Sequence, residues 1–146
     1  MIISLENASR MTTQWYQQRV VLCHGCWDVT HPGHLEHLQQ ASKLGDILVV
    51  GVTGDAYVNK GSGRPIFNES ERAFILNGLR AVDYVVITNS SSAVPLIEAV
   101  KPDYYVKGPD YENGDDHAGY LEQERQAVET YGGKLVFTNG MKYSST

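Results

Sequence analysis

The sequence has little of what marks secreted, membrane-spanning or nucleic-acid-binding proteins. Two cysteines in 146 residues are too few for the disulfide framework of a small secreted domain. No apolar run approaches the roughly 20 residues of a membrane span, and residues 1–19 lack the basic and apolar regions of a signal peptide. The net charge is -5 and no run of lysine and arginine occurs, which argues against a nucleic-acid partner. We therefore expect a cytoplasmic protein without membrane or nucleic-acid partners.

Length and composition are those of one globular domain. A chain of this size buries about 70% of the surface that its unfolded form exposes, so it needs neither a metal ion nor a disulfide to fold. Hydrophobic residues make up 42% of the sequence and charged residues 20%, which argues against a disordered chain. A small anionic substrate remains compatible with the acidic balance, because a few local cations suffice to bind one.

Five short, β-branched runs predict the strands of a sheet. Their apolar content is nearly continuous rather than alternating, which is typical of parallel strands buried on both faces. Amphipathic segments alternate with them and predict helices on both sides. The sequence therefore predicts an α/β fold, a single doubly wound (Rossmann-like) domain with a five-stranded parallel sheet. The strands are expected at 19–25, 46–53, 83–88, 103–108 and 134–138, and the helices at 32–45, 68–81, 92–101 and 118–133.

The ends of these elements carry further signals. Asn68 is a suitable N-cap for the second predicted helix. This helix is expected to bury its apolar residues, which are Phe74, Ile75, Leu76 and Leu79.

The remaining segments divide into an extension and two loops. Residues 1–18 form an N-terminal extension with a short surface helix, and residues 19–146 form the domain. Polar loops at 59–69 and 108–119 follow the carboxyl ends of predicted strands. Open α/β sheets bind ligands at that edge, so we expect both loops to flank a site.

Residues 23–38, CHGCWDVTHPGHLEHL, concentrate both cysteines and four histidines, and this composition allows three interpretations. Cys23, Cys26, His31 and His34 would supply the ligand types of a zinc site, but Cys23 lies inside an apolar strand. Cys23 and Cys26 also form a C-x-x-C, yet the helix that would activate a redox pair begins only at Pro32. Both interpretations are therefore disfavoured.

The third interpretation starts from His31-Pro32-Gly33-His34. Proline suits the first position of a helix, and glycine allows close approach of a ligand. The two histidines then lie on one face at the positive end of the helix, where free N–H groups bind anions such as phosphate. The alternative is that the two histidines only cap the helix. The pattern by itself does not distinguish a phosphate site from a helix cap. His37 is expected at the surface.

The region around these histidines resembles a known family. HGCWDVTHPGH, at 24–34, is similar to the G-x-F-D…H-x-G-H signature of cytidylyltransferase-like nucleotidyltransferases, with Trp27 in place of phenylalanine. The similarity continues in order through KGSGRP, VKGPDY and GGKLVFT to a terminal YSST, so that it spans about residues 20–146. These motifs are most similar to the nucleotidyltransferase domain of ADP-heptose synthase and its kinase-fused relatives.

The resemblance implies that a substrate phosphate attacks the α-phosphate of a nucleoside triphosphate (NTP) and releases pyrophosphate. It implies catalytic roles for His31, His34, Lys60 and Arg72, which would contact the phosphates; Arg64 is a weaker candidate. The alternative for the three basic side chains is solvated surface charge. Mg²⁺ would accompany the NTP as cofactor, held mainly by phosphate oxygens and not by a dedicated metal site of the protein.

The resemblance also implies a nucleotide-binding set. Asp28 has an alternative role as a structural turn residue, and Tyr111 stands where cytidylyltransferases carry tryptophan. The terminal hydroxyl residues resemble a motif that grips the β- and γ-phosphates. The set comprises Gly25, Cys26, Trp27, Asp28, Lys107, Gly108, Asp110, Tyr111, Ser144, Ser145 and Thr146.

The pattern departs from the family at the end of the chain. The arginine that stands just before this motif in glycerol-3-phosphate cytidylyltransferases has no counterpart in TNGMKYSST, at 138–146, which weakens the match to that enzyme. The last helix of the family is missing after Thr146, so we expect a domain cut from a longer protein, such as a kinase-fused one. The function expected is transfer from ATP or CTP to a sugar 1-phosphate. The alternatives are a CTP-dependent enzyme acting on a polyol or amino-alcohol phosphate, and a nucleotide-binding module without turnover. We also expect a homodimer.

Overall fold

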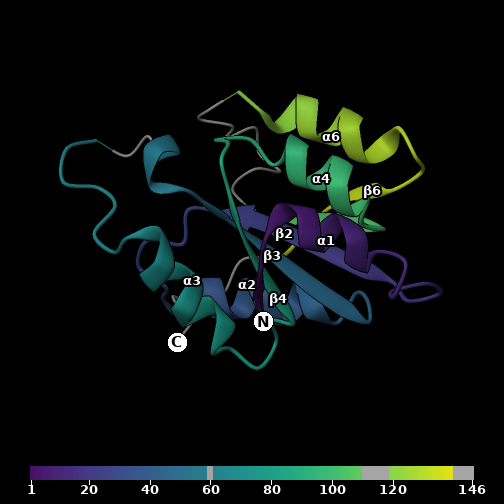
Figure 1. Ribbon diagram of the computed structural model, residues 1–146, viewed down its shortest axis with the longest axis horizontal. Helices are drawn as coiled ribbons and strands as arrows, with labels where there is room; N and C mark the ends of the chain where they lie inside the picture. Colours follow the sequence, from purple (N-terminus) through teal and green to yellow (C-terminus); the bar gives the residue numbers. More distant parts are fainter. Residues whose placement is uncertain (59–60, 110–118, 140–146) are drawn as a thin grey trace.

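The computed structural model describes residues 1–58, 61–109 and 119–139, which form a parallel sheet between two layers of helices (Figure 1). Its six strands lie in the order β1-β4-β3-β2-β5-β6. They are β1 (Ile2–Ile3), β2 (Val20–Gly25), β3 (Ile47–Thr53), β4 (Tyr84–Thr88), β5 (Tyr104–Lys107) and β6 (Lys134–Phe137). The helices are α1 (Leu5–Met11), α2 (Pro32–Ser42), the 3-10 turn η1 (Asp55–Tyr57), α3 (Glu69–Asn77), α4 (Val94–Val100) and α6 (Leu121–Glu129).

The predicted α/β class and parallel sheet are confirmed, but the strand count was wrong. The sixth strand, β1, comes from the N-terminal extension and pairs with β4 at the edge of the sheet. The extension is also not a surface helix alone, because Ala8 and Trp15 are buried in the core. Two residues of strand are too short for a periodic signal, and pairing with β4 is what makes them a strand.

Three aspartates fix where the central strands begin. The carboxylate of Asp46 accepts the N–H of Arg19, and that of Asp103 accepts the N–H of Val20. Asp83 likewise accepts the N–H of Leu48. Each carboxylate belongs to the residue just before a strand, so these hydrogen bonds satisfy backbone donors where the ladder starts. They hold β2, β3, β4 and β5 in register at the edge of the sheet opposite the predicted site.

Two hydrophobic cores cover the two faces of the sheet. In Figure 1, α1, α4 and α6 lie together on one side, and their core includes Trp15, Ile97 and Val128. Helices α2 and α3 pack on the other side, where Leu38 and Leu76 meet the strand residues. Residues of β2 alternate between the cores, with Leu22 facing the first and Cys23 the second. The strands are therefore buried on both faces, as their continuous apolar content predicts.

Helix α3 begins as predicted and buries less than predicted. Asn68 accepts the N–H of Glu71, whose carboxylate accepts the N–H of Asn68 in return, forming a capping box. Leu76 is buried, but Phe74 is 74% exposed and Ile75 37% exposed, which corrects the expectation for these two. Consecutive apolar side chains cannot all share one helical face, because successive residues point about 100° apart.

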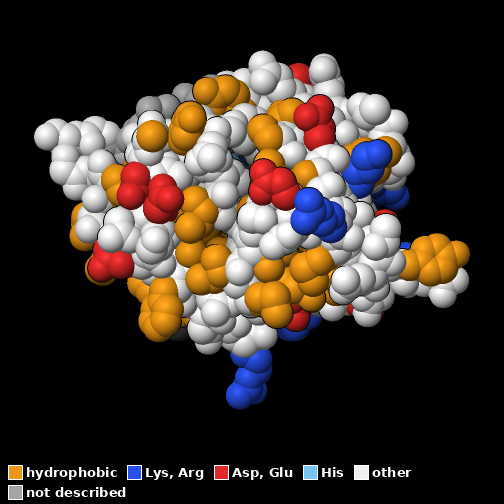
Figure 2. All heavy atoms as spheres, in the orientation of Figure 1, with side chains coloured by type: hydrophobic (Ala, Val, Ile, Leu, Met, Phe, Trp, Pro, Cys, Tyr) orange, Lys and Arg blue, Asp and Glu red, His pale blue; other side chains and the backbone are white. Residues whose placement is uncertain are grey.

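On the face seen in Figure 2, hydrophobic side chains are interspersed with charged groups of both signs. Within the described ranges, no helix combines the length and the apolar character that crossing a bilayer requires.

The sheet order places a crevice between β2 and β5. Leaving β1 aside, the remaining strands follow the order third-second-first-fourth-fifth along the chain, so the direction of winding reverses between β2 and β5. Such a reversal opens a crevice at the carboxyl ends of the two strands, because their connections leave to opposite sides. The stretch of cysteines and histidines begins at the end of β2, directly at this point.

Candidate active site

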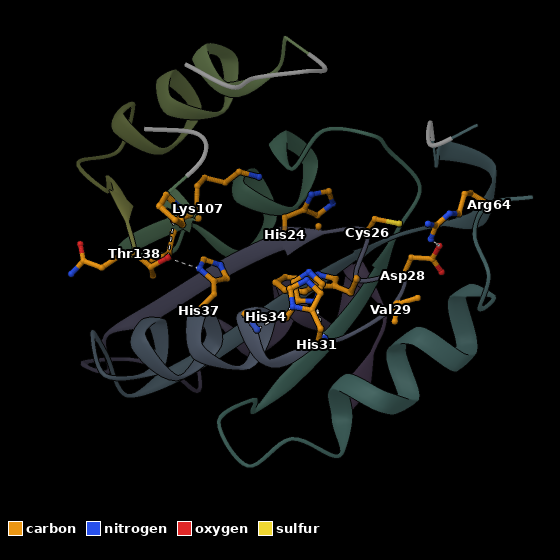
Figure 3. A pocket seen from close by; sticks show the side chains of 17 residues that line it. His24, Cys26, Asp28, Val29, His31, His34, His37, Arg64, Lys107 and Thr138 are labelled. Carbon is orange, nitrogen blue, oxygen red and sulfur yellow. Dashed lines mark hydrogen bonds and ion pairs between the residues drawn. The ribbon is translucent and has the colours of Figure 1, made fainter. Parts of the chain in front are cut away.

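A pocket of about 570 Å³ lies at this crevice (Figure 3). Its wall comes from the end of β2, the start of α2, the end of β5, Arg64 and the two residues after β6. The members from the predicted set are Gly25, Cys26, Trp27, Asp28, His31, His34, Lys107 and Gly108. The topology thus gathers residues that lie more than 80 positions apart in the sequence.

The turn after β2 is held in an uncommon backbone conformation. Trp27 has φ +55°, a value that bulky residues rarely adopt. Its buried indole Nε1–H donates to the carbonyl of Gly51 at 2.9 Å, which fixes the ring beneath the pocket. The ring meets His34 edge-on, with centroids 5.4 Å apart, and lies nearly parallel to His37 at 6.1 Å. Trp27 therefore positions two histidines at once.

His31 and His34 form the start of α2 and stack on each other, with ring centroids 3.8 Å apart. The Nδ1 atom of His31 accepts the N–H of Gly33 at 3.0 Å, and Nδ1 of His34 accepts the N–H of His31 at 3.2 Å. A neutral imidazole that accepts at Nδ1 carries its proton at Nε2. Both rings line the pocket, so the capping geometry prepares two Nε2–H donors at its wall.

The close stacking depends on Gly33. A Cβ atom at this position would come within 2.8 Å of Cε1 of His31, so a larger residue would displace that ring. Two imidazole donors and the positive end of α2 now point to the same region, which suits a bound phosphate. The alternatives left open by the sequence are therefore not exclusive, since the histidines cap the helix through Nδ1 while both side chains also line the pocket.

His37 is not the surface residue that we expected. It is half-buried, and its Nδ1 lies 2.7 Å from the hydroxyl of Thr138, just after β6. Burial, with the positive charge of Lys107 as a second cause, lowers the pKa of His37 to about 4. One turn later, the side-chain amide of Gln40 exchanges two hydrogen bonds with the backbone of Asn139. Helix α2 thus holds the chain after β6 against the pocket.

His24, the last side chain of β2 before the turn, is a pocket residue that the sequence analysis missed. It is 7% exposed and its Nε2 lies 3.0 Å from the hydroxyl of Thr88. Burial lowers the pKa of His24 to about 3, and the charge of Lys107 contributes. A polar residue next to the last position of an otherwise apolar strand was the available signal.

Asp28 has the structural role considered for it. It is buried, accepts hydrogen bonds from the N–H groups of Ile66 and Phe67, and forms an ion pair with Arg64 at 2.7 Å. Desolvation opposes ionisation here, but these hydrogen bonds prevail and lower the pKa of Asp28 to about 2. The carboxylate thereby holds the 64–67 segment against the turn, and it places the Arg64 side chain, 40% exposed, at the pocket wall.

Arg72 is neither a pocket residue nor a solvated surface charge. It is fully buried, and its guanidinium donates to the carbonyls of Cys26, Thr53 and Phe67 and to the carboxylate of Asp55. The predicted contact between Arg72 and a phosphate has no support in this arrangement. Its position instead fixes the backbone of Cys26, at the start of the turn.

The remaining predicted residues divide into two groups. Lys107 is 8% exposed at the pocket wall, with Nζ 5.6 Å from the centroid of the Tyr105 ring, and Gly108 follows it. The others lie outside the described residues; they are Lys60, Asp110, Tyr111, Ser144, Ser145 and Thr146.

The two cysteines lie in different surroundings. Cys23 is buried in the core beneath α2, and burial raises its pKa to about 12, so it stays a protonated thiol. Metal binding and disulfide exchange both need the thiolate. Cys26 lies at the pocket wall, and no set of three or more metal-ligating side chains occurs within the described ranges.

Comparisons with known proteins give matches over most of this chain. The family model described as cytidylyltransferase-like matches residues 22–146. The chain is 44% identical over 120 residues to the bifunctional protein HldE of Helicobacter pylori, a match covering 81% of this chain and 26% of that protein. It is 39% identical over 137 residues to HldE of Wolinella succinogenes, covering 91% of this chain and 29% of that protein.

A solved structure has the same fold. The lipopolysaccharide core biosynthesis protein of Thermoplasma volcanium superposes with a TM-score of 0.66 at 28% identity, covering 86% of this chain and 98% of that one. The chain spans between a quarter and a third of the length of the HldE proteins that it matches. The matched range contains every pocket residue discussed above and both histidines of the helix start. The chain therefore belongs to the cytidylyltransferase-like family of nucleotidyltransferases.

Proposed function

We propose that this domain joins the nucleoside monophosphate part of an NTP to a sugar 1-phosphate and releases pyrophosphate, as expected for an ADP-heptose-synthase-like enzyme. The observation that carries the proposal is the pair of Nε2–H donors of His31 and His34 at the start of α2, inside the crevice of the sheet. The similarity to HldE proteins and to a lipopolysaccharide core biosynthesis protein supports a sugar phosphate as acceptor.

The reaction forms one P–O bond and breaks another. An oxygen of the acceptor phosphate attacks the α-phosphorus, and the bond from that phosphorus to the bridging α–β oxygen breaks as pyrophosphate leaves. No general base is required, because the attacking phosphate oxygen is already ionised. Catalysis then rests on alignment and on stabilising charge in the transition state. Imidazole donors of fixed tautomer are suited to stabilising that charge.

Other pocket residues would hold the substrates. Lys107 adds positive charge at the end of β5, and Arg64 adds it on the opposite wall. The backbone of Gly25, Cys26 and Gly108 allows close approach of the nucleotide, while Trp27 and Asp28 hold the turn in place. Lys60, Asp110, Tyr111, Ser144, Ser145 and Thr146 remain proposed from family resemblance.

Mg²⁺ would enter with the NTP. Asp28, the carboxylate at the pocket wall, already accepts hydrogen bonds from Arg64, Ile66 and Phe67. A carboxylate so occupied is a poor ligand for a further cation, so phosphate oxygens would provide most of the coordination. The ion would neutralise charge on the triphosphate. A homodimer remains a prediction.

A pyrophosphate-release assay tests the proposal. The domain would be incubated with Mg²⁺, ATP or CTP, and a panel of sugar 1-phosphates, polyol phosphates and amino-alcohol phosphates. We expect release that depends on an NTP together with a sugar 1-phosphate. Release with CTP and a polyol phosphate alone would favour the alternative transferase. Nucleotide binding without release under any pair would favour a binding module and contradict the proposal.

A further inference from the structure

His24 is a buried polar group in the pocket to which the proposed chemistry gives no role. Its ring packs over Gly51, where a Cβ atom would lie only 2.7 Å from Cδ2 of the histidine. The missing side chain of Gly51 thus makes room for an aromatic ring at the floor of the crevice. Figure 3 shows this ring apart from the stacked His31 and His34, on the side of the pocket where Lys107 lies.

The hydrogen bonds around Thr88 fix the tautomer of His24. The Thr88 hydroxyl oxygen lies 3.2 Å from the carbonyl oxygen of Val52 and 3.5 Å from that of Ser90, and carbonyls only accept. We infer that the hydroxyl proton goes to one of these carbonyls and that Nε2–H of His24 donates to Thr88 across the 3.0 Å contact. In the neutral ring Nδ1 then carries no proton and can only accept a hydrogen bond.

This acceptor faces the open pocket. Thr88 is the hydrogen-bond partner of the His24 ring within the part of the chain that the structure describes, and Nδ1 has none there. Side-chain nitrogen and oxygen atoms that are sealed from solvent and unpaired occur, in the same part of the chain, at Trp15 and Thr30 only. Nδ1 of His24 is therefore accessible, although the residue as a whole is 7% exposed.

The charge around His24 limits what can bind it. The ring stays neutral at physiological pH, since burial and Lys107 both disfavour its protonation. A neutral acceptor calls for a hydrogen-bond donor, and the positive charge of Lys107 repels a cationic donor such as an ammonium group. A hydroxyl group meets both conditions. An amino-alcohol phosphate that placed its ammonium here would not.

We propose that His24 is a specificity-determining residue whose Nδ1 atom accepts a hydrogen bond from a hydroxyl group of a bound substrate, and so favours a ligand that carries a hydroxyl at this point over one that lacks it. This inference rests on the proposed function and deepens it. Two sources of the hydroxyl are compatible with the geometry, the ribose of the NTP and the sugar of the acceptor phosphate.

The first experiment examines the tautomer in the free protein. Long-range ¹H–¹⁵N spectra of the histidine-labelled chain should show His24 neutral at pH 7 with the proton on Nε2. Thr88→Val removes the acceptor of that proton and should shift the signals toward a mixture of tautomers. A wild-type ring with its proton on Nδ1 would overturn the inference, because the atom facing the pocket would then be a donor.

The second experiment compares two variants by equilibrium binding of ATP, CTP, their 2′- and 3′-deoxy forms and sugar 1-phosphate. His24→Phe keeps the ring and removes the acceptor, whereas His24→Asn keeps a polar group near the Nδ1 position. Losing one hydrogen bond should weaken binding of the hydroxyl-bearing partner about 3- to 10-fold in His24→Phe. The asparagine variant should retain most of the affinity.

The arms of this experiment distinguish the two sources. If the ribose is bound, His24→Phe weakens the NTP, and a deoxynucleotide without that hydroxyl binds wild type and variant alike. If the acceptor is bound, only the sugar 1-phosphate is weakened. Unchanged affinity for all ligands in a folded His24→Phe would refute the inference, even if the wild type transfers nucleotides. Weakened binding in a domain that shows no turnover would instead refute the proposed function alone.

Discussion

Four histidines within fourteen residues of one another form two pairs with opposite properties. His31 and His34 cap α2 through backbone N–H groups, and their rings stack at the pocket wall. His24 and His37 each contact a threonine hydroxyl of a neighbouring strand region, and burial lowers the pKa of both. The partner and the burial of each ring, rather than its residue type, therefore determine its role. We propose that the first two rings donate to a phosphate, whereas the other two are held by threonine hydroxyls and shape the pocket.

The largest expected effect comes from breaking the first pair. His34→Ala removes one charge-stabilising donor, and losses of this kind cost about 10²–10³ in kcat. It also removes a cap of α2, which should lower the free energy of unfolding by only about 1 kcal/mol. Steady-state pyrophosphate release and urea unfolding measure the two quantities.

His37→Ala is the matched control, one turn further along the same helix. It removes the contact with Thr138 and leaves both capping histidines in place. Its kcat should fall far less than that of His34→Ala. Equal losses of kcat in the two variants would contradict the division of the histidines into two pairs.

The second pair, His24 and His37, should make the free energy of unfolding depend on pH. The pKa of an unfolded histidine is about 6.5, whereas burial lowers the pKa of His24 to about 3 and that of His37 to about 4. Below pH 6.5 the unfolded chain therefore binds protons that the folded chain does not, and stability falls as the pH is lowered. Each ring contributes up to about 1.4 kcal/mol per pH unit, until the pH reaches its folded pKa.

Urea unfolding at pH 7, 6 and 5 measures this slope. His24→Asn should remove the part of the slope that His24 contributes. The double variant, His24→Asn with His37→Asn, should remove the contributions of both histidines. The depressed pKa of Asp28 costs stability only below about pH 4, where unfolded aspartate becomes protonated, so it does not confuse the comparison. A wild-type stability that is independent of pH between 7 and 5 would contradict the neutral, buried state of these rings.

The smallest effect concerns Trp27, which contacts one member of each pair. Trp27→Phe removes the hydrogen bond to Gly51, which should cost about 1 kcal/mol of stability and a few-fold in kcat. Trp15→Phe is the control, because the buried Nε1 of Trp15 has no hydrogen-bond partner in the described part of the chain. That variant should lose no hydrogen bond. A greater loss of stability in Trp15→Phe than in Trp27→Phe would be evidence against the positioning role of Trp27.

Local patterns were sufficient to predict most of the fold. The strands and helices follow from continuous apolar runs, the Asn68 cap and the proline at the start of α2, and the crevice follows from their order. Strand β1 could not be predicted, since two residues acquire strand geometry only by pairing with β4. The exposure of Phe74 was likewise missed, because it depends on which face of α3 meets the sheet.

The site residues likewise divide into those that the sequence predicts and those that only the fold reveals. The capping contacts of His31 and His34 lie within four consecutive residues, so the sequence contains the information. His24 and Arg72 depend on partners distant in the chain: Thr88 lies 64 residues after His24, and Cys26 lies 46 residues before Arg72. No spacing rule links such positions. The sequence therefore indicates the pair that we propose to bind phosphate, and the fold is needed to find the residues that surround it.

Transfer of isotope from labelled NTP tests the central claim most directly. The wild-type chain would be incubated with Mg²⁺, a sugar 1-phosphate and ATP or CTP labelled at either the α- or the γ-phosphate, and the products separated by chromatography. Attack at the α-phosphorus predicts that the α-label enters a sugar nucleotide and the γ-label enters pyrophosphate. Appearance of the γ-label on the sugar phosphate, or no labelled product at saturating nucleotide, would contradict the account.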